Sequence, residues 1–270
     1  MKKSKHFWNK EYLRPAYLAL STEPASDLEK FTRWQERNYG REFLNPQTFV
    51  LDLGCGNGRN LIFLAREFGC RGVGYDISSE AIAQARTTAG NFFQVLGKAS
   101  QPKAFLGSSE TIPRTLEKSP VASLDFQVRQ LNEKIPLADN SVNIVLDMMS
   151  SHVLKQQERE QLRNEIWRVL RPGGWLFFKS FLLEEDLNAR RMLRDHPATE
   201  SNSYIHPVLG IQEHVWTIDE LEDFFTAQFE IRKIEKSHKH LKRPPLRQGF
   251  AGRNVPFRRR TVTIYLQKRD

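Results

Sequence analysis

A glycine-rich turn between an apolar strand and an amphipathic helix is the feature that most restricts how this chain can fold. Residues 48–53 (TFVLDL) are β-branched and apolar, which predicts a buried strand. The strand leads directly into Gly54, Gly56 and Gly58, and residues 60–68 (NLIFLAREF) then have helical apolar spacing. Glycine permits the positive φ of a tight turn, and a helix N-terminus attracts an anionic group. The pattern therefore predicts a ligand-binding turn at a strand end.

An acidic residue ends the next strand at a position suited to a ribose contact. Residues 71–75 (RGVGY) read as a second short strand, and Asp76 follows 22 residues after Gly54. A carboxylate at this position can accept hydrogen bonds from ribose hydroxyls. A dinucleotide fingerprint would place its third glycine at position 59, which is Arg59 here. The spacing therefore departs from the nicotinamide pattern and favours a shorter nucleoside ligand.

Predicted strands and helices alternate along most of the chain. Further strands are expected at residues 124–128, 142–146, 175–178, 229–234 and 261–266. Further helices are expected at residues 81–89, 157–170, near 184–195 and after Thr217. A strand, a glycine turn, a helix and a second strand form a βαβ unit, which predicts a parallel sheet.

Two segments lie outside this alternation. Residues 4–40 read as helical, with a break at Pro15 and a new start near Ser26, and we expect them to pack on the core as a cap. Glycine and proline interrupt residues 91–121, which predicts an insertion or a long loop.

Five ordered segments resemble the motifs of class I S-adenosylmethionine-dependent methyltransferases. These segments are VLDLGCGNGRN (50–60), GVGYDISSEAI (72–82), IPLADNSVNIVLD (135–147), WRVLRPGGWLFF (167–178) and TIDELEDFF (217–225). The resemblance covers roughly residues 45–235 and implies an α/β fold of the Rossmann-like, doubly wound type. The implied sheet is mostly parallel and seven-stranded, with an antiparallel C-terminal strand. The implied domains are an N-terminal helical cap (1–44) and a methyltransferase domain (45–270).

The resemblance also implies a site for S-adenosylmethionine. The implied cofactor-binding residues are Asp52, Gly54, Cys55, Gly56, Asp76, Ile77, Gln130, Leu131, Asp147 and Met148. Those of the glycine turn would lie under the methionine part of the cofactor, and Asp76 would hold the ribose. Asp147 and Met148 would border the sulfonium and the acceptor. Family members usually place an acid beside the adenine, where this chain offers Gln130 or Asn132.

Methyl transfer requires little from side chains, because the sulfonium is already an activated donor. The site mainly aligns acceptor, methyl and sulfur, and a base helps only if the acceptor must lose a proton. The candidate catalytic residues are Asp147 and His152, and Tyr204, His206 and His214 are further candidates by position. The scattered histidines have no metal-ligand spacing, so we expect no metal site.

The methyl acceptor is the least determined part of the prediction. Residues 231–270 hold 13 Lys and Arg against two acids, and within them 236–260 is expected to be a basic hairpin loop. A basic segment suits RNA, but Phe250 and Phe257 offer few rings for stacking bases. We therefore expect a small-molecule acceptor. An RNA methyltransferase and a cofactor-binding but inactive regulatory subunit remain as alternatives.

Composition restricts the setting of the protein. The 270 residues are 39% apolar with a formal charge of +9, and the longest apolar runs are too short to span a bilayer. The basic N-terminus is not followed by an apolar signal region. Two cysteines cannot form a disulfide framework, so a cytoplasmic setting is expected. The oligomeric state is left open.

Overall fold

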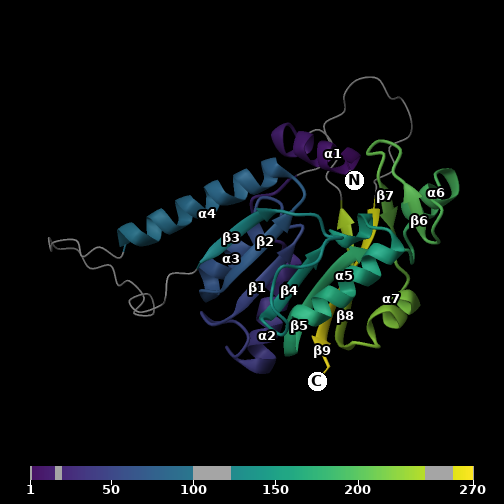
Figure 1. Ribbon diagram of the computed structural model, residues 1–270. Coiled ribbons are helices and arrows are strands. Elements are labelled where there is room, and N and C mark those ends of the chain that lie inside the picture. Colours follow the sequence, from purple (N-terminus) through teal and green to yellow (C-terminus); the bar gives the residue numbers. More distant parts are fainter. Residues whose placement is uncertain (1, 16–19, 100–122, 241–257, 270) are drawn as a thin grey trace.

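The computed structural model describes residues 2–15, 20–99, 123–240 and 258–269 (Figure 1). The main sheet contains β1 (Phe49–Leu53), β2 (Arg71–Asp76), β3 (Leu124–Val128), β4 (Val142–Met148), β5 (Leu170–Phe181), β8 (Phe229–His240) and β9 (Arg258–Lys268). The helices are α1 (Lys2–Leu13), α2 (Ser26–Tyr39), α3 (Arg59–Phe68), α4 (Ser79–Ala99), α5 (Gln156–Val169), α6 (Leu187–Asp195) and α7 (Ile218–Phe225). A short 3-10 helix, η1 (Ser151–Val153), follows β4.

The seven strands are ordered β3-β2-β1-β4-β5-β9-β8. The pairs β2–β3, β1–β2, β1–β4 and β4–β5 are parallel. β9 runs antiparallel to both β5 and β8, between which it lies. The strand order therefore confirms the Rossmann-like, mostly parallel sheet and its antiparallel C-terminal strand.

Alternating side chains of the strands bury two cores, one on each face of the sheet. On one face Val50 and Phe177 pack with residues of α2, α3 and α4. On the other face Leu51 and Phe178 pack with residues of α5 and α7. The helices therefore cover the sheet from both sides (Figure 1), and the carboxyl ends of the parallel strands meet at one edge.

The N-terminal helices lie where the sequence predicts them, and they contact different parts of the molecule. Phe31 of α2 packs on Phe177 of β5, with 4.8 Å between the ring centroids. Lys179 of β5 pairs with Asp27 of α2, and both side chains are largely buried. The helix α1 packs on α4 instead. The division into a cap and a methyltransferase domain remains a prediction.

Three sequence expectations need correction. α4 continues to Ala99, so the first part of the expected insertion 91–121 is helical. Its two glycines, Gly90 and Gly97, each cost a helix only about 1 kcal/mol. β5 begins at Leu170 rather than Trp175, because Gly173 has a φ of 68° and a register shift lets the turn join the sheet. Residues 100–122 lie outside the described residues.

The last correction concerns the basic hairpin. β8 and β9 pair as far as His240 and Arg258, so residues 236–240 and 258–260 are strand rather than loop. Residues 241–257 lie outside the described residues. Sequence analysis also missed a small antiparallel hairpin, β6 (Ser203–Ile205) and β7 (Gln212–His214), because strands this short carry little periodicity. In the described part of the chain, no helix has the length and apolar character to cross a membrane.

Candidate functional site

The glycine turn between β1 and α3 adopts a backbone that only glycine fits. Gly54, Gly56 and Gly58 have φ values of 69°, 56° and 78°, which L side chains rarely adopt. A Cβ on Gly54 would lie 2.3 Å from Ser150 Oγ, and a Cβ on Gly56 would lie 2.2 Å from Tyr12 Oη. The two glycines therefore leave room for the side chains of Ser150 and Tyr12 to approach the backbone of the turn.

The amides of the turn are bonded within the fold rather than left open. The N–H groups of Gly54 and Cys55 both donate to the carbonyl oxygen of Tyr75, at 2.7 and 3.0 Å. The N–H of Gly56 donates to Asp76 Oδ2 at 2.9 Å. These bonds tie the turn to the end of β2.

Asp76 is the acid at the end of β2, as the sequence predicts, and it is 9% exposed. Its Oδ1 accepts from the N–H of Ser78 at 2.8 Å, and its Oδ2 accepts from Gly56. Burial raises the pKa of Asp76, against the opposing effect of these backbone hydrogen bonds. Each oxygen retains a lone pair that can accept from a hydroxyl.

Two further buried carboxylates end the strands beside the turn. Asp52 of β1 is 1% exposed, and its Oδ2 has no hydrogen-bond partner among the described residues. Burial and the charge of Asp76 raise the pKa of Asp52 to about 8. Asp147 Oδ1, at the end of β4, accepts from the N–H of Ser151 at 3.1 Å, and burial raises the pKa of Asp147 to about 6. Such a cluster favours a cation, since bringing positive charge near it relieves repulsion and desolvation.

The end of β4 is held against the glycine turn by side-chain hydrogen bonds. Asn60 Nδ2 donates to Met148 Sδ at 3.5 Å, and Ser150 Oγ donates to the carbonyl oxygen of Leu53 at 2.7 Å. Met149 adopts a φ of 64°, a conformation uncommon outside glycine. Local sequence patterns do not indicate Asn60 and Ser150 as site residues, because their partners lie about 90 residues away along the chain.

The remaining predicted cofactor residues differ in their burial and in their hydrogen bonds. The Cys55 thiol points into the core, where a Cβ on Gly74 would meet it at 2.8 Å, and burial raises its pKa. Only the backbone of Cys55 can therefore face a ligand. Ile77 is half-buried directly after Asp76. Gln130 Nε2 donates to Glu133 at 2.8 Å.

Two residues near the end of β3 face α5 rather than open space. Leu131 packs against the core that α5 covers. Asn132 Nδ2, the alternative adenine partner, donates to Glu158 Oε1 of α5 at 2.8 Å. This bond ties the Asn132 amide to α5, whereas the Gln130 amide bonds only to Glu133, three residues further along the same loop.

Three of the four candidate bases after β4 and β5 are buried, and His206 is the exception. His152, on η1, is 6% exposed and lies edge-on to Phe181, with 5.1 Å between ring centroids. Tyr204 donates to Glu213 Oε2. His206 is half-buried, and burial lowers its pKa.

His214 is held from both sides. Its Nδ1 lies 2.9 Å from Ser203 Oγ, and its Nε2 lies 2.9 Å from Glu220 Oε1. Although burial by itself would raise the pKa of Glu220, the contact with His214 holds that pKa below its usual value. These bonds place His214 within the β6–β7 hairpin as a structural residue.

Arg259 contradicts the expectation that 236–260 is a solvated basic loop. It is 5% exposed, with Nε 3.0 Å from Asp186 Oδ2 and Nη1 3.7 Å from Glu213 Oε2. Its guanidinium lies 3.7 Å from the ring centroid of Phe181. Local composition predicted an exposed cation, whereas the fold buries Arg259 between α6 and the β6–β7 hairpin. Arg190, Arg191 and Arg194 of α6 are exposed instead.

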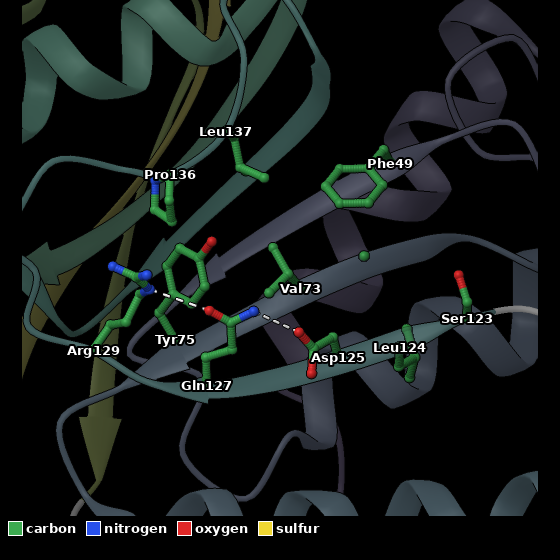
Figure 2. A pocket seen from close by; sticks show the side chains of 11 residues that line it. Phe49, Val73, Tyr75, Ser123, Leu124, Asp125, Gln127, Arg129, Pro136 and Leu137 are labelled. Carbon is green, nitrogen blue, oxygen red and sulfur yellow. Dashed lines mark hydrogen bonds between the residues drawn. The ribbon is translucent and has the colours of Figure 1, made fainter.

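A groove of about 420 Å³ lies on the sheet face at the β2–β3 edge (Figure 2). Phe49, Val73 and Tyr75 line it, together with the hydrogen-bonded side chains of Gln127 and Arg129. None of the predicted site residues lines this groove, so we do not assign it to the site. Within the described residues, no group of three His, Cys, Asp or Glu side chains is arranged to hold a metal.

The strand order, the glycine turn and the acid of β2 together define a nucleoside-binding α/β protein. Residues 51–178 match the family model of a methyltransferase domain. A solved S-adenosylmethionine-dependent methyltransferase from Methanosarcina mazei superposes with a TM-score of 0.60 at 25% identity, covering 85% of this chain and 96% of that one. Residues 51–178 therefore form a methyltransferase domain, and the chain has the fold of S-adenosylmethionine-dependent methyltransferases.

Curated relatives match over shorter spans. Carboxy-S-adenosyl-L-methionine synthase from Aliivibrio fischeri is 27% identical over 167 residues, which is 60% of this chain and 57% of that protein. Indolepyruvate C-methyltransferase from Streptomyces griseus is 40% identical over 47 residues, 17% of this chain and 14% of that protein. The matches thus span little more than half of these relatives at most.

Proposed function

We propose that this protein transfers a methyl group from S-adenosylmethionine to a small-molecule acceptor. The observation that carries the proposal is the set of three buried carboxylates, Asp52, Asp76 and Asp147, around a turn of bare glycine backbone. One of their oxygens, Asp52 Oδ2, has no partner among the described residues. S-adenosylmethionine brings two cationic groups, an ammonium and a sulfonium, together with ribose hydroxyls, and this donor set fits it.

Each predicted residue then has a definite task. Gly54 and Gly56 leave room for close approach to the backbone, and Asp76 accepts from the ribose through its free lone pairs. Asp52 and Asp147 stabilise positive charge near the turn. The remaining predicted contacts, toward the adenine and the acceptor, are assigned to Ile77, Gln130, Leu131 and Met148. When bound, the cofactor supplies a methyl group on a positively charged sulfur.

Asp147 and His152 are the proposed catalytic residues. With a pKa of about 6, Asp147 is ionised in most molecules at neutral pH, so it can attract the cationic donor. His152 follows β4 on η1, and a neutral imidazole can accept a proton from an acceptor that must lose one. Phe181 holds the His152 ring from one side. Both residues act mainly by position, because in-line transfer depends on alignment.

The preference for a small acceptor has two supports. The relatives with named activities include an indolepyruvate C-methyltransferase and a glycine/sarcosine/dimethylglycine N-methyltransferase from Actinopolyspora halophila. In addition, Arg259, one of the 13 Lys and Arg of residues 231–270, is buried in ion pairs and is not available to phosphate groups. This burial weakens the main argument for RNA as acceptor.

Calorimetry and a transfer assay test the proposal in sequence. We expect binding of S-adenosylmethionine and of S-adenosylhomocysteine, and none of NAD. NAD binding without S-adenosylmethionine binding would overturn the cofactor assignment. Labelled methyl transfer is then screened against small-molecule and RNA fractions of a cell extract. Label in RNA alone would favour the RNA reading, and cofactor binding without any transfer would favour an inactive regulatory subunit.

A further inference from the structure

The helix α1 lies outside the matched methyltransferase domain, yet it reaches the glycine turn. Figure 1 shows α1 above the edge of the sheet to which the parallel strands point. Two bonds hold it on the start of α4. Gln84 Nε2 donates to the carbonyl oxygen of Tyr12 at 2.9 Å, and Ser79 Oγ donates to Asn9 Oδ1 at 3.4 Å.

The phenol of Tyr12 is the part of α1 that meets the turn. A Cβ on Gly56 would lie 2.2 Å from Tyr12 Oη, so the hydroxyl sits directly over this glycine. Burial raises the pKa of the hydroxyl, and the nearby charge of Asp76 adds to the effect. Tyr12 therefore stays protonated at any working pH and is a hydrogen-bond donor. Among the described residues, this hydroxyl has no hydrogen-bond partner.

A side-chain donor over Gly56 would add to what the first part of the turn offers a ligand. The N–H groups of Gly54, Cys55 and Gly56 are bonded to Tyr75 and Asp76. A carboxylate arriving at the start of the turn would find these three amides occupied, and it would also lie near the buried carboxyl group of Asp52. A neutral hydroxyl directed at the same place can donate to that carboxylate without adding charge.

We infer that Tyr12 is a binding residue of the cofactor site, with its hydroxyl donating to the carboxylate at the amino-acid end of S-adenosylmethionine. The inference rests on the proposed function, and it extends the site beyond residues 51–178 to the N-terminal helix. It also gives α1 a task, because the Tyr12 carbonyl group and the Asn9 side chain bond to α4 and hold the phenol over the turn.

Tyr12→Phe tests the inference, because it removes the hydroxyl and keeps the ring. Calorimetry compares S-adenosylhomocysteine, which has the amino-acid end, with 5′-methylthioadenosine, which lacks it. We expect Tyr12→Phe to weaken S-adenosylhomocysteine binding by roughly 10-fold or more, because the variant loses one hydrogen bond to a charged group. The affinity for 5′-methylthioadenosine and the unliganded melting temperature should stay unchanged.

Two control variants distinguish a cofactor-binding role of Tyr12 from a purely structural one. Leu13→Ala changes an exposed residue next along α1, and Tyr39→Phe removes a phenol hydroxyl from α2; both should bind like the parent. Equal S-adenosylhomocysteine affinity in Tyr12→Phe and the parent would overturn the role of Tyr12 alone. A parallel loss for 5′-methylthioadenosine would also overturn it, in favour of a structural role. A parent that binds neither nucleoside would overturn the proposed function itself.

Discussion

Asp76 accepts a hydrogen bond from the backbone N–H of Gly56, with 2.9 Å between Asp76 Oδ2 and Gly56 N. The acid that ends the second strand therefore holds the glycine turn that follows the first. Its other oxygen accepts from Ser78 N, so one side chain joins the turn, the end of β2 and the start of α4. Asp76 thus has a structural task in addition to the proposed ribose contact.

Asp76→Ala should therefore lower stability as well as cofactor affinity. Losing a carboxylate that accepts two buried backbone bonds should cost about 1–3 kcal/mol in the free energy of unfolding. Cofactor affinity should fall roughly 10-fold or more, measured by calorimetry. Asp76→Asn, which keeps one acceptor oxygen, should lose less of both. A parent-like unfolding free energy in urea for Asp76→Ala would contradict the structural task.

Asp52 should make the unliganded protein less stable as pH rises. Its pKa is about 8 when folded, against about 3.9 for an unfolded aspartate, so the folded state binds more protons between these values. Stability contributed by the protonated group is present below pH 4 and is lost progressively toward pH 8, at up to roughly 1.4 kcal/mol per pH unit. Asp147, with a pKa of about 6, adds a contribution of the same sign at lower pH.

Urea unfolding between pH 5 and pH 8 checks this expectation with Asp52→Asn as the test variant. The parent should lose stability across the range, whereas Asp52→Asn should show a flatter profile and exceed the parent at pH 8. Coincident profiles for the two proteins would show that the Asp52 carboxyl is not perturbed.

Cofactor binding should release a proton near pH 7. A cation placed beside Asp52 favours its charged form and lowers its pKa, so a carboxyl that is mostly protonated becomes ionised. Calorimetry with S-adenosylmethionine in buffers of different ionisation enthalpy measures the number of protons released. We expect a release that approaches one proton, and its disappearance in Asp52→Asn. Binding heats that do not depend on the buffer would contradict this coupling.

Gly54→Ala should destabilise the turn for two reasons that a control can separate. The positive φ costs an L-residue roughly 1–2 kcal/mol, and the overlap with Ser150 adds roughly 1–3 kcal/mol. Gly210 also has a positive φ, of 64°, but a Cβ there meets nothing within 4 Å. Gly210→Ala should therefore show only the first cost in thermal unfolding, and equal losses in both variants would contradict the overlap.

Arg259→Ala should unfold the region between α6 and the β6–β7 hairpin. Removing one partner of a buried pair leaves Asp186 uncompensated, which costs about 3–5 kcal/mol. Arg194→Ala, which removes an arginine whose side chain is 75% exposed, should leave the melting temperature unchanged. RNA or heparin binding that falls in Arg259→Ala with unchanged stability would restore the RNA reading.

The local sequence was sufficient to predict the glycine turn, the acid of β2 and the succession of main-sheet strands and helices along the chain. These features follow from short-range rules. A positive φ requires glycine at Gly54, Gly56 and Gly58. Apolar strands alternate with amphipathic helices, and the spacing of apolar residues identifies both kinds of element in the sequence. For the same reason the family could be identified from motifs such as residues 50–60.

Only the tertiary structure decided what the polar side chains do. Tyr12 reaches Gly56 from a separate helix, the amides of the turn are bonded to β2, and Arg259 is buried against Asp186, 73 residues away in the sequence. Whether a side chain is buried or paired depends on which segments the fold brings together, and residue composition does not determine these contacts. A run of arginines therefore predicted an exposed surface, whereas the β5–β9–β8 pairing placed Arg259 in the interior.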